Sequence, residues 1–247
     1  MKDKVILISG GTDGIGLATA KKFLKEGNSV VISGRTEENG KKAEQELSDL
    51  GNVTYIQADA SSEEDCKNLV EKTIEKHGRI DVLANIAGVI GKRDGFLESD
   101  NEDTLNTIRI NLMGPIYMAQ HAAKHMVKAG EGVIINVASL VGVIANHEPI
   151  GYHASKAGLR MATSVMAKDL SEKGIRVLAV APGWINTSML EGIEEETKAK
   201  GESMHMKNRL IEPEEIANAI YLLSTPEASA INGTTVMTED GYTAFKM

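Results

Sequence analysis

Seven short apolar runs, rich in β-branched residues, alternate with helical stretches at intervals of about 25 residues along this chain. This alternation is typical of βαβ units, in which parallel strands are joined through right-handed helical crossovers. The predicted strands are Val5–Ser9, Ser29–Ser33, Val53–Ala58, Ile80–Ala84, Val133–Ala138, Ile175–Ala181 and Gly233–Met237. We therefore predict an α/β fold built on a seven-stranded, doubly wound parallel sheet.

The chain is predicted to form one domain over residues 1–247. Its length and its hydrophobic content of 42% suffice for one sizeable core, and no repeat, low-complexity tract or linker divides it. Asp100–Ala129 has a helical period throughout, which predicts one long helix. Residues 188–210 break the alternation of strands and helices. Methionines and Leu190 are scattered there among polar residues, so we predict that this segment is a mobile substrate lid.

Charge and cysteine content limit the partners and the compartment. The formal net charge is -8 and no dense block of Lys and Arg occurs, so neither nucleic acid nor an anionic membrane is an expected partner. Cys66 is the single cysteine, and eleven methionines would be prone to oxidation outside the cell. No signal segment and no run of about eighteen apolar residues is present. We expect a cytoplasmic protein.

A glycine-rich turn, residues 10–16, joins the first predicted strand to the helical stretch Leu17–Glu26. Its glycines, Gly10, Gly14 and Gly16, permit a tight turn and the close approach of a ligand to the backbone. The helix that follows offers free N–H groups and a partial positive charge to a phosphate. A glycine cluster alone is weak evidence, but at the first strand-to-helix turn it predicts a dinucleotide-binding site.

The end of the second predicted strand indicates which dinucleotide is bound. The chain has Gly34 and Arg35 there, with no carboxylate to bind the ribose 2′-hydroxyl of NAD. A guanidinium can donate two parallel hydrogen bonds to the 2′-phosphate of NADP. Asp13 favours NAD mildly, and Arg35 could instead be a solvated loop cation. We expect NADP(H) in preference to NAD(H). Asp59 is either an adenine partner or a loop and capping acid.

The residues Asn85, Ala87 and Gly88 follow the fourth predicted strand. The small residues would let the backbone approach a ligand, and Asn85 could tie adjacent strands together. Asn111 lies within a helical pattern, where an asparagine costs helix propensity. Asn111 is therefore either a residue with a polar task on the inner face or a tolerated misfit.

Tyr152 and Lys156 are spaced to lie one helical turn apart on the same face. A phenol is nearly all neutral at pH 7, so it exchanges protons efficiently only if a nearby cation lowers its pKa. Lys156 is placed to do so. Ser139 ends the fifth predicted strand, at the edge of the sheet where such folds bind ligands. The alternative is an ordinary amphipathic helix with a surface tyrosine and lysine.

Together these residues resemble the short-chain dehydrogenase/reductase family over essentially the whole chain. The matching residues, in the family's order and spacing, are Gly10, Gly14, Gly16, Asp59, Asn85, Ala87, Gly88, Asn111, Ser139, Tyr152, Lys156, Pro182, Gly183 and Thr187. The resemblance implies a Rossmann fold, a nicotinamide cofactor and a homo-oligomer, either a tetramer or a dimer. It implies cofactor contacts from Gly10, Thr12, Asp13, Gly14, Ile15, Gly16, Arg35, Asp59, Ala60, Asn85, Ala87, Gly88, Tyr152, Lys156, Pro182, Gly183, Ile185 and Thr187.

The resemblance also implies a role for each of four catalytic residues. Tyr152 would be the acid/base, and Ser139 would hold the carbonyl or hydroxyl oxygen. Lys156 would bind the nicotinamide ribose and lower the pKa of the tyrosine. Asn111 would hold a water molecule that links the lysine to solvent. No metal is implied.

Three features bear on how far the resemblance extends. Ile86 stands where the family usually has a second asparagine, and the placement of the cofactor should survive this change. The usual Asp-Gly-Gly near the C-terminus is Glu239-Asp240-Gly241-Tyr242 here, and because this segment often contacts a neighbouring subunit in the family, the oligomer is implied less firmly than the fold. Divergent enoyl reductases of the superfamily place Tyr and Lys seven residues apart. The spacing of four between Tyr152 and Lys156 favours chemistry on C=O and C–OH groups.

We therefore expect an NAD(P)-dependent oxidoreductase that interconverts a ketone and a secondary alcohol of a small substrate by hydride transfer. The first alternative is a specific role as a 3-oxoacyl-(acyl carrier protein) reductase. The second is a catalytically silent protein that senses dinucleotides. His121 and His125 have metal-ligand spacing but no third ligand, so packing is expected instead. The sequence leaves open whether His147 or the methionines of residues 188–210 contact substrate.

Overall fold

The computed structural model describes residues 1–245 and shows a single seven-stranded sheet with all neighbouring strands parallel. The strands are β1 (Val5–Ser9), β2 (Ser29–Gly34), β3 (Val53–Gln57), β4 (Val82–Asn85), β5 (Gly132–Val137), β6 (Ile175–Pro182) and β7 (Thr235–Thr238). Their order is β3-β2-β1-β4-β5-β6-β7, so the direction of winding reverses between β1 and β4. Ligands of open α/β sheets bind at such a reversal, outside the carboxyl ends of the strands. The predicted α/β, doubly wound, single-domain fold is confirmed.

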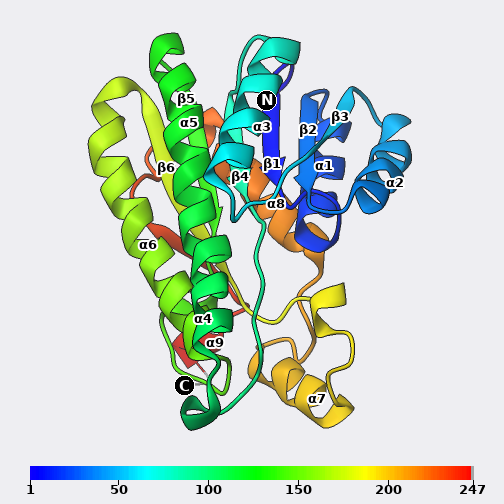
Figure 1. The fold of residues 1–247 in the computed structure, drawn as a ribbon, viewed down its shortest axis with the longest axis vertical. Coiled ribbons are helices and arrows are strands. Elements are labelled where there is room, and N and C mark those ends of the chain that lie inside the picture. The colour runs from blue at the N-terminus through cyan, green and yellow to red at the C-terminus, as the bar shows by residue number, and fades with distance from the viewer. Residues whose placement is uncertain (246–247) are drawn as a thin grey trace.

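Helices cover both faces of the sheet (Figure 1). One face carries α1 (Gly14–Lys25), α2 (Glu37–Ser48) and α8 (Pro213–Ser224), whose buried side chains share one hydrophobic cluster. The other face carries α3 (Glu63–His77), α5 (Gly114–Ala129) and α6 (Ile150–Leu170). The inner strands β1 and β6 are largely apolar because side chains on both of their faces are buried, whereas the edge strands β3 and β7 are only partly buried. No helix within residues 1–245 combines the length and the apolar character needed to cross a bilayer.

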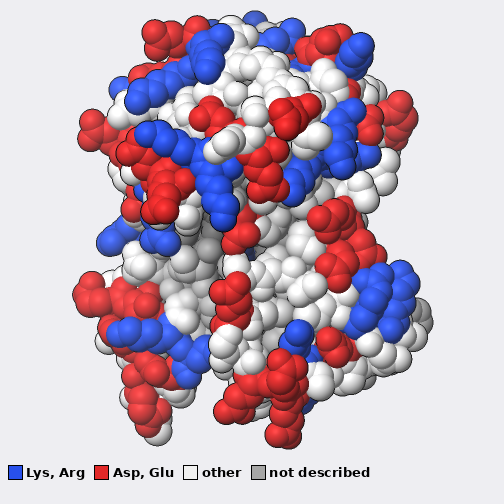
Figure 2. Space-filling view, turned by 90° about the vertical axis from the view of Figure 1, so that its right-hand side faces the viewer, with Lys and Arg blue, Asp and Glu red and all other residues white. Residues whose placement is uncertain are grey.

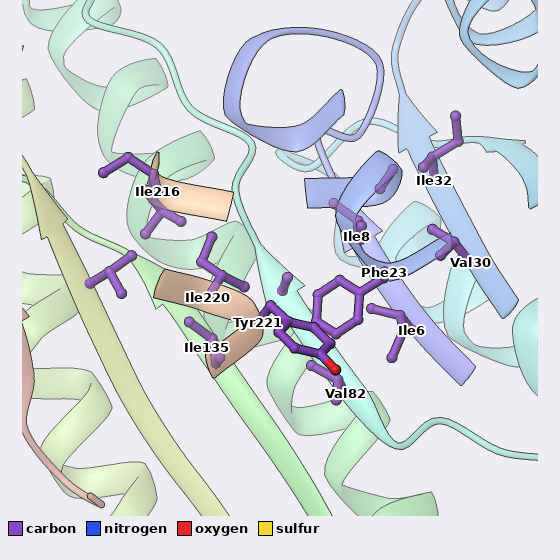
Figure 3. Close-up of a cluster of buried hydrophobic side chains, with 14 of the residues drawn as sticks. Ile6, Ile8, Phe23, Val30, Ile32, Val82, Ile135, Ile216, Ile220 and Tyr221 are labelled. Carbon is purple, nitrogen blue, oxygen red and sulfur yellow. The ribbon is translucent and has the colours of Figure 1, made fainter. Parts of the chain in front are cut away.

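The core of the first face is centred on aromatic packing between α1 and α8 (Figure 3). The rings of Phe23 and Tyr221 meet edge to face, with their centroids 5.4 Å apart and their planes at 65°. Ile6 of β1 and Ile220 of α8 are fully buried in the same cluster. This contact fixes α1, and therefore the turn that precedes it, against the sheet.

Two regions differ from the sequence prediction. The expected long helix over Asp100–Ala129 is divided into α4 (Asn101–Ile108), a π-helical segment (Arg109–Met113) and α5. The division occurs at Pro115, whose backbone lacks the N–H that an uninterrupted helix would need. Residues 188–210 contain α7 (Glu195–Met204), which protrudes at the lower end of the molecule (Figure 1). Among the residues of α7 only Gly201 is buried, so no apolar period announces this helix in the sequence.

The remaining elements are short. A small C-terminal helix, α9 (Tyr242–Phe245), follows β7, which begins two residues later than predicted, beyond a left-handed Gly233 with φ 69°. The 3₁₀ turns are Phe96–Glu98, Leu140–Gly142, Ser171–Lys173, Ser188–Leu190 and Pro226–Ala228. Ser62 caps α3, because its side chain accepts a hydrogen bond from Asp65 N at 3.2 Å.

Replacement of Phe23 by alanine should lower the free energy of unfolding by about 3–5 kcal/mol, because the change leaves a cavity beneath Tyr221 in a site that is fully buried. Phe96→Ala is the matched control. The side chain of Phe96 is 77% exposed, so its removal should change stability by no more than about 0.5 kcal/mol. Urea denaturation of the two variants measures both values, and equal losses would contradict the packing described here.

Candidate active site

A cavity of about 600 Å³ opens at the carboxyl end of the sheet and spans the reversal between β1 and β4. Predicted cofactor residues on its wall are Gly10, Thr12, Asp13, Gly14, Ile15, Gly16, Arg35, Asp59, Ala60, Ala87, Gly88, Pro182, Gly183, Ile185 and Thr187. Three of the predicted catalytic residues, Ser139, Tyr152 and Lys156, line the same cavity. Figure 2 shows one face of the molecule hollowed across its middle, above the part that contains α7.

The turn after β1 requires glycine at several positions. Gly10 has φ 73°, and a Cβ atom placed on it would lie 2.6 Å from the backbone nitrogen of Ala87. A Cβ atom on Gly16 would lie 1.8 Å from the carbonyl oxygen of Gly10. The bare backbone of this turn and the start of α1 at Gly14 face the cavity, which is the arrangement that a pyrophosphate group needs. These residues therefore fit a dinucleotide.

Asp13 connects the glycine turn to the segment after β6. Its carboxylate caps α1 by accepting a hydrogen bond from Gly14 N at 2.7 Å, and it also accepts one from the hydroxyl of Ser188. A Cβ atom on Gly14 would lie 3.0 Å from Cγ2 of Thr187, so the turn and this segment pack closely together.

At the far end of the cavity lie Arg35 and Asp59. The guanidinium of Arg35 has no salt bridge within residues 1–245, and its backbone carbonyl accepts a hydrogen bond from Gln57 at 2.8 Å. Asp59 accepts a hydrogen bond from Ser61 N at 2.8 Å while lining the cavity. Asp59 is thus a loop acid in this structure. It also lies on the wall of the cavity, where it could contact a bound dinucleotide.

Tyr152 and Lys156 lie at the start of α6, one turn apart as predicted. The ammonium nitrogen Nζ of Lys156 is 5.8 Å from the centroid of the Tyr152 ring and donates a hydrogen bond of 2.8 Å to the carbonyl of Val137, the last residue of β5. Ser139 stands two residues beyond that carbonyl, and its hydroxyl is hydrogen-bonded to the Tyr152 side chain. The strand end and the helix start therefore bring three polar groups to one place on the cavity wall.

Asn111 lies behind that wall, in the π-helical segment. Its side-chain oxygen accepts a hydrogen bond from Val89 N at 2.8 Å, and its amide nitrogen donates to Val89 O at 2.7 Å and to the Ser155 hydroxyl at 3.2 Å. A Cβ atom on Gly88 would lie 3.2 Å from Oδ1 of Asn111 and 3.5 Å from Nζ of Lys156. Asn111 thus has a polar task, because it holds the loop after β4 beside the lysine.

Asn85 is buried within the sheet and is not on the cavity wall. Its amide nitrogen donates to Oδ1 of Asn136 at 2.9 Å and to the carbonyl of Pro115 at 3.4 Å. Asn85 and Asn136 are paired residues of β4 and β5, so the tie between adjacent strands that the sequence suggested is present. The structure separates Asn85 from the other predicted cofactor residues.

Burial shifts the pKa values of both members of the Tyr152 and Lys156 pair. It raises the pKa of Tyr152, an effect that the hydrogen bond to Ser139 opposes in part, and it lowers the pKa of Lys156 from 10.5 to about 8. The lowering of the phenol pKa by Lys156 therefore stays a prediction, because burial dominates here and the pKa of Tyr152 is raised. Burial determines the direction of both shifts, and the ammonium group of Lys156 is directed to the carbonyl of Val137, 5.8 Å from the centroid of the tyrosine ring.

Several residues that line the cavity were not found from sequence. Arg93 and Glu148 form a two-point salt bridge, with Nε to Oε2 at 3.0 Å and Nη2 to Oε1 at 3.2 Å. They are 55 residues apart and follow no common motif, so no local signal marks them. Trp184 also lines the cavity.

The structure places several of the histidines and methionines that the sequence singled out. Met189 and Leu190 line the cavity, as do Asn146 and Glu148 on either side of His147, but His147 itself does not. Nε2 of His121 lies 4.0 Å from Glu63. Within residues 1–245, no group of three or more His, Cys, Asp or Glu side chains is arranged to hold a metal ion.

Comparison with known proteins gives matches along the chain. A family model described as Enoyl-(Acyl carrier protein) reductase matches residues 10–243. The 3-oxoacyl-(acyl-carrier-protein) reductase FabG of Thermotoga maritima is 37% identical over 98% of this chain and 98% of its own length. A crystal structure of levodione reductase is 30% identical, with a TM-score of 0.94 over 99% of both chains. A structure of actinorhodin polyketide ketoreductase with NADPH is 29% identical, with a TM-score of 0.93 over 99% of this chain and 100% of that one.

The shifted pKa of Lys156 predicts a pH-dependent stability. The folded-state pKa of about 8 lies below the ordinary value of 10.5, so between these values the unfolded chain holds a proton that the folded protein has released. Stability therefore rises with pH across this window, by up to about 3 kcal/mol, and the cost of the buried charge is fully present below pH 8.

Lys156→Met removes the titrating group, so its stability relative to the wild type should be greatest near pH 7 and should decrease toward pH 10.5. Urea denaturation at several pH values measures the difference. Lys168→Met, which removes an exposed lysine from the same helix, is the control. Parallel stability curves for Lys156→Met and the wild type would contradict the shift.

Proposed function

Because this chain belongs to the short-chain dehydrogenase/reductase family, we propose that Ser139, Tyr152 and Lys156 form its catalytic centre, supported by Asn111. The chain is an oxidoreductase that acts on CH–OH and C=O groups, interconverting a ketone and a secondary alcohol. The observation that carries our assignment is one continuous cavity, whose wall includes both the glycine turn and the residues Ser139 and Tyr152. A protein that only sensed dinucleotides would have no need of Ser139 and Tyr152 on the wall of the same cavity.

Carbonyl chemistry is favoured over reduction of a C=C bond. The matching family model carries the name of an enoyl reductase, but the relatives compared above are named as 3-oxoacyl, levodione and polyketide ketoreductases. Tyr152 and Lys156 are one turn apart, so the phenol and the ammonium group share one helix face beside the hydroxyl of Ser139.

In the proposed mechanism these residues control the oxygen of the substrate. A bound nicotinamide cofactor supplies the hydride in reduction and accepts it in oxidation. The raised pKa keeps Tyr152 protonated at pH 7, so its hydroxyl donates a proton to the carbonyl oxygen as negative charge develops there. The Ser139 hydroxyl donates a second hydrogen bond to the same oxygen, and each such donor contributes roughly 3 kcal/mol of transition-state stabilisation.

Lys156 supplies a positive charge close to the reacting groups. With a pKa of about 8 it is charged at neutral pH, and its hydrogen bond to Val137 fixes its position. The charge favours any anionic form of the phenol and of the substrate oxygen, most strongly where bound ligands exclude water.

NADP(H) is the cofactor we propose in preference to NAD(H). Members of this family bind a nicotinamide dinucleotide, and Arg35 lies on the cavity wall at the end of β2 with no competing salt bridge within residues 1–245. A guanidinium in that place can bind a 2′-phosphate through two hydrogen bonds. Asp13 should repel the 2′-phosphate of NADP less than its charge suggests, because its carboxylate accepts hydrogen bonds from Gly14 N and from the Ser188 hydroxyl.

A 3-oxoacyl-(acyl carrier protein) reductase is the second candidate function. It is supported by the likeness to the enzyme of that name from Thermotoga maritima. An acidic carrier protein would need a basic surface near the cavity. On the face in Figure 2, Lys and Arg are instead interspersed with Asp and Glu, which favours a small free substrate.

We further propose that residues 188–210 form the substrate lid of the single domain. Met189 and Leu190 line the cavity and the following α7 stands away from the core, which supports this assignment. A cytoplasmic location is proposed from the single buried Cys66 and the eleven methionines. A homo-oligomer, a tetramer or a dimer, is proposed from family membership alone.

Tyr152→Phe should abolish turnover of carbonyl substrates, because the ring is kept while the proton donor is removed. Binding of NADPH should be retained within about threefold, since the phenol hydroxyl is one of many contacts on the cavity wall. The measurement is NADPH consumption over a panel of ketones, with cofactor affinity from fluorescence titration. Substantial turnover by the variant would overturn the proposed role of Tyr152.

Arg35→Ala should weaken the binding of NADPH by roughly tenfold to a hundredfold while changing NADH affinity little, because a hydrogen-bonded charge pair with the 2′-phosphate is lost. Arg35→Lys keeps the charge but not the two-point geometry, so its NADPH affinity should lie between those of the wild type and Arg35→Ala. Fluorescence titration with each cofactor measures the affinities. An equal loss for both cofactors would show that Arg35 does not distinguish them.

A further inference from the structure

The Arg93–Glu148 salt bridge joins two loops at the Tyr152 end of the cavity. Arg93 belongs to the loop that follows β4, and Glu148 to the loop that leads into α6. Both side chains line the same cavity as Ser139 and Tyr152. The charges of Glu148 and Arg93 also act in opposite directions on the pKa of Tyr152, which places both near the phenol.

Glu148 is the fixed and more buried member of the pair. Its side chain is 12% exposed, against 39% for Arg93. The backbone N–H of Glu148 donates to Oδ1 of Asn146 at 2.9 Å, and the backbone N–H of Asn146 donates to Nε2 of His153 at 3.2 Å. Because His153 follows Tyr152 on α6, the catalytic helix itself holds the loop that carries Glu148.

The other charged residues on the cavity wall lie toward the proposed cofactor site or contact the backbone. Asp13, Arg35 and Asp59 lie on the side of the glycine turn and the ends of β2 and β3. Lys156 donates to the carbonyl of Val137 beneath the tyrosine. Of the charged residues that line this cavity, Arg93 and Glu148 are therefore the ones left to contact the part of a substrate beyond its reacting carbon.

The two-point geometry decides what the pair offers to a ligand. A guanidinium has five N–H donors, and the two bonds to Glu148 use two of them, so three stay available on the more exposed partner. A neutral oxygen can accept from these donors without disturbing the salt bridge. An anionic group would either lie beside the carboxylate of Glu148 or displace it, which would leave a mostly buried charge without its partner.

We propose that this salt bridge determines substrate specificity: Arg93 binds a second, uncharged oxygen of the substrate, and Glu148 excludes substrates that carry an anion at that position. The favoured class is ketones with a further carbonyl, ester or hydroxyl group near the reacting carbon. This inference rests on the proposed function, since it concerns the substrate held against Ser139 and Tyr152.

Three ketones with the same methyl ketone end test the proposal. Pentan-2-one lacks a second oxygen function, methyl acetoacetate has a neutral one, and acetoacetate has an anionic one. Comparing ratios of kcat/KM between variants cancels the intrinsic reactivities of the three compounds. The wild-type protein should prefer the neutral ester to acetoacetate.

Glu148→Gln keeps the size of the side chain and frees the charge of Arg93. The ratio of kcat/KM for acetoacetate to that for methyl acetoacetate should rise at least roughly tenfold in this variant. The double variant Arg93→Glu with Glu148→Arg keeps a salt bridge between the loops but replaces the exposed donor by an acceptor. Its preference for the ester over pentan-2-one should fall at least roughly tenfold, with the melting temperature retained. A purely structural salt bridge would leave both ratios unchanged within about threefold.

A binding measurement separates failure of this inference from failure of the proposed function. Trp184 is the single tryptophan and lines the cavity, so its fluorescence reports binding of each ketone in the presence of NADP⁺, where no turnover occurs. The expected order of affinities without turnover of any ketone would support the inference and overturn the proposed function. Turnover with unchanged ratios in both variants would overturn the inference alone. Failure of the ester to bind more tightly than pentan-2-one would also overturn it.

Discussion

The hydrogen bond from the ammonium group of Lys156 to the carbonyl of Val137 connects the start of α6 to the end of the inner strand β5. It forms in a buried place, where an unpaired ammonium group would be strongly unfavourable, so it constrains the whole start of α6. Tyr152 is one turn from the lysine and Ser139 is two residues beyond the carbonyl, so the relative positions of all three polar groups follow from this contact.

The topology of the sheet supplies the second constraint. Because β4 pairs with β1 on the side away from β2, the loop that follows β4 is brought against the glycine turn. The backbone nitrogens of Ile86 and Ala87 both donate to the carbonyl of Ser9, at 3.1 and 2.9 Å. A side chain at Gly10 would prevent this approach. The cavity between the two loops therefore follows from the fold of the chain, and it extends from the glycine turn to Tyr152.

The sequence predicts the features that local pattern encodes. The strands, the glycine turn and the one-turn spacing of Tyr152 and Lys156 depend on residues close together in the chain, and they appear as expected. The salt bridge between Arg93 and Glu148 depends on two loops that meet only after the sheet has formed, so it has no local signal. The same limit applies to α7, whose residues lack an apolar face. The break before α5 does have a local signal, Pro115, but the helical period of the whole segment predicts one helix.

The pKa of Tyr152 shows why residue identity alone is insufficient for electrostatics. The spacing of a tyrosine and a lysine suggests attraction between phenolate and ammonium, yet both groups lie in a poorly solvated place where each charge is disfavoured. Burial raises the pKa of Tyr152 and lowers that of Lys156. If both groups are ionised together, their attraction offsets part of the cost of burying the two charges. A neutral phenol beside a charged lysine is thus the resting state near pH 7, which suits proton donation to a carbonyl. Oxidation of an alcohol needs the phenolate, and the additional positive charge of an oxidised nicotinamide ring would favour it. In the mechanism we propose, the direction of the reaction would therefore depend on the charge of the bound cofactor through the solvation of Tyr152.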